Sequence, residues 1–532
     1  MEATTAHKRR RNGLAGAVAL AVGVALLAAA CSSGGRSKAS RQPPPSKAYS
    51  TLRVTWEEPG SMDPGLANTI AAWQVLWNVN LGLLGYKHVA GVEGTKLVPY
   101  LAESLPTISS NGTVYKFKLR PNLKYSNGRP VEAKDFLYTI KRDYLIKSPG
   151  ARLFSSILGA ADFGRTKKGK IPGIVTNDVQ RTITIKLSHP MDGMENILAT
   201  VFAAPVPTGT PKPDQSTRAI PSTGPYMVKS YTPRRGFVLV RNPSFKSNKI
   251  PDVPAGYPDE VVGKMASDPA TALRSVLSGH SDYDALTVPI DRLPDLRHTY
   301  SRRLKLYTSP TTYYYFMNER VPPFSKLEAR QAVNYAIDRN AIAEKILAGL
   351  AKPTQNILPP SYPQYKKIDY YEYDLGKAIE LVRKSRTVGM KITVWGVNTP
   401  LSNALTEYLA GVLDTIGWRA TPKLLGSRTE AQIGFADRYQ AFPNPIDWFA
   451  ALFKHGNARF PDVGKRIGAL AQKTGTNAGG WASIDHDLVV KYAAAAPFAN
   501  GRGTDFFGPK IDTGCYVFHV LYRFDFSQIC MK

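Results

Sequence analysis

Segments with the two-residue period of a β-strand alternate with helix-like segments along most of this chain. Tyr115, Phe117 and Leu119 alternate with basic residues, the pattern of a half-buried strand. Residues 131–144 then favour a helix, and an aromatic strand-like run over 313–318 is again followed by helical periodicity. Strands that alternate with helices at such distances predict α/β lobes.

The chain is long enough for several domains. About 480 residues follow residue 49, which suits two to four domains. The hydrophobic content of 43% and the aromatic content of 10% favour large folded cores over disorder. We find no repeat of fixed period.

The N-terminal 31 residues have the parts of a secretory signal peptide. A basic stretch precedes an apolar run over residues 14–30, and small residues lead directly to Cys31. This arrangement looks like a lipobox, so residues 1–31 predict a lipoprotein signal peptide with acylation of Cys31. Residues 32–49, rich in Ser, Gly and Pro, suit a flexible tether. An ordinary signal peptide with an unmodified cysteine stays open.

We expect such a lipoprotein to lie on the extracytoplasmic face of the cytoplasmic membrane, where two fatty chains on one cysteine would hold it stably. Cys515 and Cys530 would then lie in an oxidising compartment and could form a disulfide. Two buried free thiols would look the same in sequence, so both states stay open.

The formal net charge is +28. A charge of this size favours contact with anionic lipid headgroups, acidic wall polymers or anionic ligands. The basic residues are spread along the chain without an arginine-rich block or a known binding motif, so we expect no nucleic-acid partner.

Three motifs occur in order along the chain. The first is YKFKLRPNLKYSNGRP over residues 115–130, followed by EAKDF over 132–136. The second is PSTGPY over 221–226 with RNP over 241–243. The third, NERVPPFSKLEARQAVNYAIDR over 318–339, contains a predicted capping box at its SKLE and an aspartate, Asp338, that can cap a second helix.

Together these motifs resemble the extracytoplasmic solute-binding proteins of family 5, the oligopeptide, dipeptide and nickel type that serves ABC importers. The resemblance implies a two-lobed, periplasmic-binding-protein-like α/β fold with a hinge. It implies a lobe I made of residues 50–95, 205–308 and 501–532, an inserted subdomain of residues 96–204, and a lobe II of residues 309–500. It also implies a monomer that closes on its solute and delivers it to a membrane permease and its ATPase.

The sequence departs from the family pattern in residues 432–448, QIGFADRYQAFPNPIDW. In peptide binders an aspartate of this segment pairs with the α-ammonium group of the peptide, and here Ala441 takes its place. Arg438 stands where tryptophan is common, so we expect an inverted local charge that does not favour a free peptide N-terminus. Asp437 could substitute for the missing carboxylate, and Asp447 could cap a helix.

Several aromatic residues are further candidates for the wall of the cleft. Tyr313 and Tyr315 share one strand face, and Trp395 ends a predicted strand. Tyr439 and Phe442 flank the departure at Ala441. For each of these the alternative is a place in the core of a lobe.

We expect no enzyme activity, because no nucleophile and base can be paired and no Gly-x-Ser-x-Gly elbow occurs. The eight histidines show no metal-ligand spacing, so we predict no metal and no cofactor. The default ligand is an oligopeptide or peptide-like solute. A non-peptide anionic small molecule, or a sensor or wall lipoprotein that kept the fold and lost transport, are the alternatives.

Overall fold

The computed structural model describes residues 50–109, 111–424, 431–449, 460–473 and 478–532. The chain divides into two units, Met1–Pro44 and Pro45–Lys532, and the described residues all belong to the second. The predicted signal peptide, Cys31 and the tether lie outside these residues. Within them, none of the helices combines the length and the apolar character that a bilayer crossing needs.

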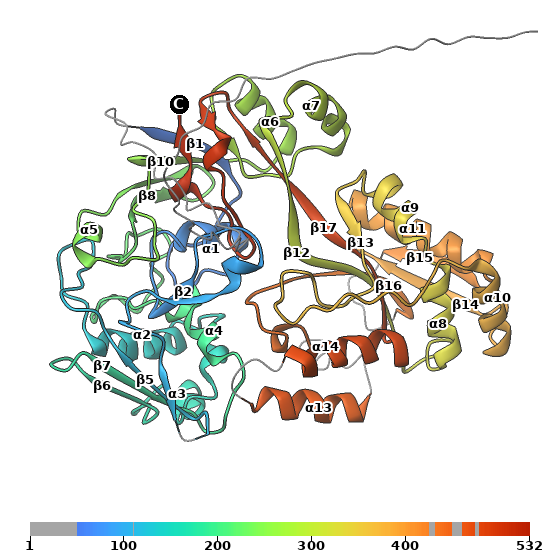
Figure 1. Cartoon of the computed structure of the whole chain (residues 1–532), viewed down its shortest axis with the longest axis horizontal. Coiled ribbons are helices and arrows are strands. Elements are labelled where there is room, and N and C mark those ends of the chain that lie inside the picture. Colours follow the sequence, from blue (N-terminus) through green and yellow to red (C-terminus); the bar gives the residue numbers. More distant parts are fainter. Residues whose placement is uncertain (1–49, 110, 425–430, 450–459, 474–477) are drawn as a thin grey trace, which may run out of the picture. The chain divides into compact units, whose positions relative to one another are not determined.

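One large sheet joins the two lobes. Its strand order is β15-β14-β16-β12-β17-β11-β1-β10-β9-β8, and β13 also pairs with β17 (Figure 1). The strands are β1 Thr51–Trp56, β8 Tyr226–Thr232, β9 Gly236–Arg241, β10 Glu260–Met265, β11 Tyr283–Asp284, β12 Leu304–Met317, β13 Ala351–Pro353, β14 Lys391–Gly396, β15 Arg419–Leu424, β16 Ile433–Tyr439 and β17 Ala495–Phe507.

The long strands β12 and β17 run antiparallel and connect lobe I to lobe II (Figure 1). The predicted lobe boundaries, 308/309 and 500/501, fall inside them. Their register shifts between Thr308 and Thr312, around Pro310. Proline has no N–H to donate to a ladder, so the irregularity falls where the sequence requires it.

Lobe I is assembled from segments that are far apart in the sequence. The Trp56 ring on β1 meets Phe237 at 5.8 Å and Phe526 of the C-terminal tail at 6.4 Å between ring centroids. These residues share one apolar core with the inserted subdomain. Burial of such large rings supplies much of the free energy that holds the three segments together.

Helices pack on the sheet and fill the cores. They are α1 Ile70–Leu76, α2 Ala133–Leu145, α3 Ala160–Thr166, α4 Met194–Leu198, α5 Phe245–Asn248, α6 Pro269–Leu277, α7 Leu293–Thr299, α8 Leu327–Ala336, α9 Arg339–Ala341, α10 Leu375–Lys384, α11 Pro400–Thr415, α13 Pro461–Ala471 and α14 Ala478–His486. Shorter helical turns are Val92–Thr95, Ala151–Phe154, Val201–Ala203, Ile290–Arg292, Ile342–Ile346, Asp487–Lys491, Thr513–Cys515 and Phe526–Gln528.

Helix starts in lobe II agree with the sequence in one case and differ in another. Asp338 caps α9, because its Oδ1 accepts the Ala341 N–H at 2.9 Å. The capping box predicted at residues 325–328 is wrong, because α8 begins at Leu327 and its cap residue, Lys326, makes no side-chain capping bond. The Lys326 ammonium instead donates to the Ser385 carbonyl at 2.7 Å.

The inserted subdomain has its own sheet, β4-β5-β7-β6. Its strands are β4 Thr107–Ser109, β5 Val114–Lys118, β6 Ile174–Asn177 and β7 Thr182–Lys186. On β5, Tyr115 and Phe117 are buried while Lys116 and Lys118 are exposed, so the alternation in the sequence is confirmed. Helix α2 starts at a capping box made by Glu132 and Asp135.

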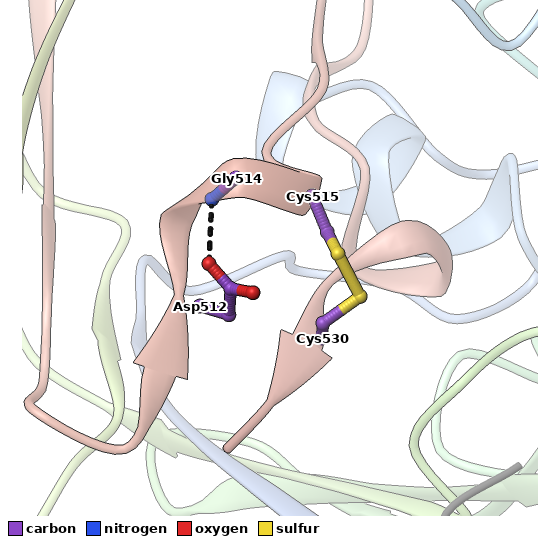
Figure 2. The surroundings of a disulfide bond; sticks show 4 residues. All are labelled: Asp512, Gly514, Cys515 and Cys530. Atoms are coloured by element: carbon purple, nitrogen blue, oxygen red, sulfur yellow. Dashed lines mark hydrogen bonds between the residues drawn. A yellow bond between two sulfur atoms is a disulfide. The ribbon is translucent and has the colours of Figure 1, made fainter. Parts of the chain in front are cut away.

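Three two-stranded pieces complete the fold. They are β2 Leu84–Tyr86 with β3 Leu97–Pro99, β18 Ile511–Asp512 with β21 Cys530–Met531, and β19 Phe518–His519 with β20 Arg523–Phe524. Cys515 and Cys530 form a disulfide with their Cα atoms 5.6 Å apart, beside the turn in which Asp512 accepts the Gly514 N–H (Figure 2). Of the two cysteine states left open by the sequence, the structure shows the disulfide.

Candidate functional site

Two glycines on β17 make room for tyrosine rings where the connecting strands pass between the lobes. A Cβ on Gly503 would lie 2.1 Å from Cζ of Tyr307, and one on Gly501 would lie 3.0 Å from Oη of Tyr313. Side chains at these positions would displace the rings. The glycines therefore set where the two tyrosines stand on this face of the sheet.

Tyr313 lies at the end of the lobe II core. Its half-buried ring meets Phe435 at 5.9 Å and Phe498 at 6.3 Å between centroids. Burial raises the pKa of its hydroxyl, and the nearby Asp437 carboxylate raises it further. Tyr315, two residues along, is fully buried, and its hydroxyl donates to the Leu405 carbonyl at 3.0 Å. The structure thus places Tyr315 in the core and leaves Tyr313 at its edge.

Asp437 stands directly opposite Tyr313 in the β12–β16 ladder. Residues opposite each other in a ladder share a face, so the carboxylate and the phenol lie on the same side of the sheet. Asp437 is exposed, and in the described part of the chain no cation lies within ion-pair distance of it. It is a free carboxylate at the edge of lobe II.

Arg438 points to the other face and is already paired. It donates to the Asp447 carboxylate at 3.0 Å and to the Asp447 carbonyl, and it lies 5.7 Å from the centroid of Trp448. Burial raises the pKa of Asp447, and the Arg438 charge opposes this rise. The expected inversion of local charge is therefore wrong, because Asp447, nine residues after Arg438, neutralises the charge of the arginine.

Ala441, which takes the place of the family aspartate, packs against lobe I. The Ala441 N–H donates to Asp447 Oδ2 at 2.9 Å, so Asp447 holds this turn and does not cap a helix by its side chain. Ala441 and the buried Phe442 pack against the lobe I core. The Phe442 carbonyl accepts the Tyr362 hydroxyl at 3.4 Å. Ala441 and Phe442 therefore act as packing between the lobes in this structure.

Trp395 lies on the sheet face opposite to Asp437. It is buried against Phe316 at 6.0 Å between centroids, in a small cluster with Tyr314 and Ala436. Because Ala436 and Asp437 are neighbours in a strand, their side chains point to opposite faces. The structure does not bring Trp395 together with Tyr313 and Asp437.

Tyr439 joins lobe II to the C-terminal tail of lobe I. Its hydroxyl donates to the Leu521 carbonyl at 3.1 Å, and the Arg523 guanidinium lies 6.0 Å from its ring centroid. Tyr307 stacks on Phe518 at 3.7 Å between centroids. We call Tyr307, Tyr313, Asp437, Tyr439 and Arg523 the interlobe site.

Tyr307 and Arg523 were not among the site residues predicted from the sequence. No motif surrounds either residue, and Arg523 is 84 positions from the tyrosine it faces. Only the pairing of the tail with lobe I brings them to the site. The one usable signal was the cysteine pair that brackets Arg523 in the sequence.

One edge of β16 is open beside this site. On one side β12 pairs with the whole strand, but on the other side β14 pairs only with Ile433 and Gly434. From Phe435 to Tyr439 that edge has no strand partner among the described residues. Phe435 and Ala436 are buried and Asp437 is exposed, so the part of this edge that can offer its N–H and C=O groups to an extended chain is Asp437 to Tyr439.

In the described ranges no three His, Cys, Asp or Glu side chains are grouped as metal ligands. The buried Asp505 behind the site is held by two phenols: its oxygens accept the hydroxyls of Tyr283, at 2.8 Å, and of Tyr516. Burial raises the pKa of Asp505 to about 6, against the effect of these hydrogen bonds.

Residues 96–459 match the family model for bacterial extracellular solute-binding proteins, family 5 middle. The chain is 27% identical over 318 residues to the periplasmic oligopeptide-binding protein OppA of Salmonella typhimurium, covering 58% of this chain and 56% of that protein. It is 26% identical over 368 residues to the glutathione-binding protein GsiB of Shigella flexneri, covering 68% and 66%. The alignments with these curated relatives thus span less than two thirds of the relatives' length.

Solved structures share the fold over almost the whole chain. The clavulanic acid biosynthesis oligopeptide binding protein 2 superposes with a TM-score of 0.82 at 20% identity, covering 92% of this chain and 96% of that one. The periplasmic binding protein DppA of Helicobacter pylori, in complex with the peptide STSA, superposes with a TM-score of 0.69 at 20% identity, covering 90% and 98%. These likenesses concern the two-lobed fold.

Proposed function

Because the chain belongs to the bacterial extracellular solute-binding proteins of family 5, we propose that it is the substrate-binding component of an ABC importer. It captures oligopeptide or peptide-like solutes between its lobes and releases them unchanged to a permease driven by an ATPase. Closure around the solute is the state that the permease would recognise. The protein acts as a monomer.

The open edge of β16 is the observation that carries this proposal. An extended peptide can add to such an edge as an extra strand, through main-chain hydrogen bonds that do not depend on its side chains. The edge runs from Phe435 to Tyr439 and so ends at the interlobe site. Asp437 supplies a carboxylate for an α-ammonium group. It lies four residues before Ala441, which occupies the position of the family aspartate.

A second candidate is a solute without a free amino terminus, such as an anionic small molecule. Ala441 favours it, because a side chain without a carboxylate cannot pair with an ammonium group. The two candidates differ in what they require of Asp437: a peptide with a free amino terminus needs its charge, and an anionic solute does not.

The anchor is part of the proposal. Cys31 carries two fatty chains and holds the protein on the extracytoplasmic face of the cytoplasmic membrane. Labelling cells with radioactive palmitate tests this directly: we expect label on the wild-type protein and none on the Cys31→Ser variant. Label on neither protein would contradict the anchor but not the capture of solutes.

Native mass spectrometry of the full chain in mild detergent tests the binding function. The protein is offered a pool of peptides of two to five residues and the same pool N-acetylated. We expect capture of the free pool, with the preference for free over acetylated peptides lost in Asp437→Asn. Glu407→Gln, a change on the exposed side of α11, is the matched control. Equal capture of both pools by the wild type would favour the second candidate.

A further inference from the structure

The C-terminal hairpin, residues 513–530, is held rigidly on lobe I. His519 contacts the Gly94 carbonyl through Nε2 at 2.7 Å, and Asp525 contacts His88 Nδ1 at 2.7 Å. The Gln74 amide donates to the Phe524 carbonyl at 3.0 Å. The Cys515–Cys530 disulfide closes the base of the hairpin (Figure 2). A side chain on its strand β20 is therefore pre-organised, which reduces the entropy lost when it binds a ligand.

Arg523 is the cation that this hairpin presents to lobe II. Its φ of 59° is in the left-handed region, which residues other than glycine, asparagine and aspartate seldom adopt. The half-buried guanidinium lies against the Tyr439 ring across the lobe boundary. No carboxylate of the described residues is within ion-pair distance of it. A partly buried cation without a direct counter-ion is costly, so a function for it has to be considered.

The acidic groups around Arg523 are accounted for. Asp505 uses its oxygens to accept the Tyr283 and Tyr516 hydroxyls. Glu57 is exposed to solvent, and Asp437 lies on the lobe II strand beyond Tyr313. Burial lowers the pKa of Arg523, while the Tyr307 and Tyr439 phenols and then Glu57 raise it, with a net rise. Arg523 also lowers the pKa of Asp505, and its guanidinium hydrogen-bonds the Tyr439 hydroxyl. The cation is thus stabilised without an ion pair, and a guanidinium has further N–H donors beyond that one bond.

Asp437 and Arg523 approach the same phenol from the two lobes. Asp437 faces Tyr313 in the ladder, and Asp437 and Arg523 shift the pKa of the Tyr313 hydroxyl in opposite directions. A solute lying over Tyr313 would therefore have an anion on its lobe II side and a cation on its lobe I side.

We propose that Arg523 binds a carboxylate of the solute, so that the solutes of this protein carry a free carboxylate that faces the C-terminal hairpin. This inference rests on the proposed binding function and names the chemistry that it selects. Guanidinium and carboxylate match as a bidentate, charge-assisted pair. Because the arginine belongs to lobe I and the open β16 edge to lobe II, the carboxylate would draw the two lobes onto one ligand.

The test compares peptides with and without a C-terminal charge. The full chain in mild detergent is offered an equimolar pool of peptides of two to five residues with free carboxylates, mixed with the same sequences as C-terminal amides. Native mass spectrometry counts the captured molecules. We expect the wild type to prefer the acids by about tenfold or more, and Arg523→Gln to take acids and amides alike. Arg523→Lys should keep a reduced preference, because it has the charge without the fork.

Arg419→Gln, a change of an exposed arginine on β15, is the matched control and should behave as the wild type. Thermal unfolding of each variant shows whether it is folded, and the lysine variant serves if the glutamine variant is not. Capture of acids and amides alike by the wild type refutes the carboxylate subsite and leaves the proposed function standing. Unchanged preference in both Arg523 variants refutes it as well. Capture of neither class contradicts the proposed function and the subsite together.

Discussion

The indole nitrogen of Trp481 donates a hydrogen bond of 3.0 Å to the carboxylate of Asp192. Trp481 lies in α14 of lobe II and Asp192 in the inserted subdomain, and the Asp192 N–H also donates to the Ala471 carbonyl at 2.7 Å. The indole is fully buried. The inserted subdomain and lobe II thus share a buried polar contact, which any separation of these two parts would break.

Replacing Trp481 with phenylalanine should therefore weaken closure. The change leaves the buried Asp192 without one of its donors, which costs about 1–3 kcal/mol. We expect solute affinity to fall about tenfold and small-angle scattering to show a larger fraction of open molecules. Trp418→Phe is the control, since it removes a comparable bond of 2.9 Å to Thr387 within lobe II. A similar loss of affinity in both variants would contradict a role in closure.

Gly503→Ala should disturb the floor of the interlobe site. The new methyl group would meet the Tyr307 ring at 2.1 Å, so the ring has to leave its stack on Phe518. We expect a loss of about 1–3 kcal/mol in the free energy of unfolding, typical of overpacking. Chemical denaturation measures this loss. Gly411→Ala, in α11 with no atom within 4 Å of the new Cβ, should be neutral or stabilising.

Asp284 should make stability fall as pH rises. Burial raises its pKa to about 7, and its Oδ2 is buried without a partner, while Oδ1 accepts from Thr55 and Leu286. The folded protein therefore holds a proton that the unfolded chain releases between about pH 4 and 7, so folding is favoured at the acid end and loses stability through this window.

Asp284→Asn removes the ionisation and keeps an acceptor for Thr55 and Leu286. The free energy of unfolding of this variant should equal that of the wild type below about pH 4, and it should exceed it by at most about 4 kcal/mol above pH 7. Urea midpoints for both proteins at pH 4, 6 and 8 check this. A difference between the two midpoints that stays constant from pH 4 to pH 8 would contradict the raised pKa of Asp284.

Removing the disulfide should loosen the C-terminal hairpin. Cys515 and Cys530 are 15 positions apart, a loop for which the chain-entropy model gives about 3 kcal/mol. We expect the Cys515→Ser, Cys530→Ser double variant to unfold at lower temperature in calorimetry and to bind carboxylate-bearing peptides more weakly. Reducing agent should lower the wild-type midpoint by a similar amount and leave the double variant unchanged.

Much of the fold followed from local patterns. Alternation at Tyr115 and Phe117 predicted β5, and Asp338 predicted the start of α9, because both depend on residues within one element. The capping box predicted for α8 is absent, because its cap residue is Lys326, whose ammonium has only donors and cannot accept from the first turn; it contacts the Ser385 carbonyl, 59 positions away. Contacts over such distances leave no trace in a local pattern.

The same limit applies to the site. The replacement of the family aspartate by Ala441 was visible in the sequence, but the neutralisation of Arg438 by Asp447 was not. Tyr313 and Tyr315 share a face, yet only the packing of α11 shows that one is covered and the other lies at the edge. Arg523 reaches the site through the tail of the chain, which periodicity cannot place.

The shared core of Trp56, Phe237 and Phe526 also sets an order of biogenesis. Lobe II is one continuous stretch and can fold as soon as it is synthesised, whereas lobe I has to wait until its last segment, some 470 residues after β1, has emerged. During that interval its apolar strands are unprotected. Truncation of even the final twenty residues would leave the first half of the molecule as a substrate for chaperones and proteases.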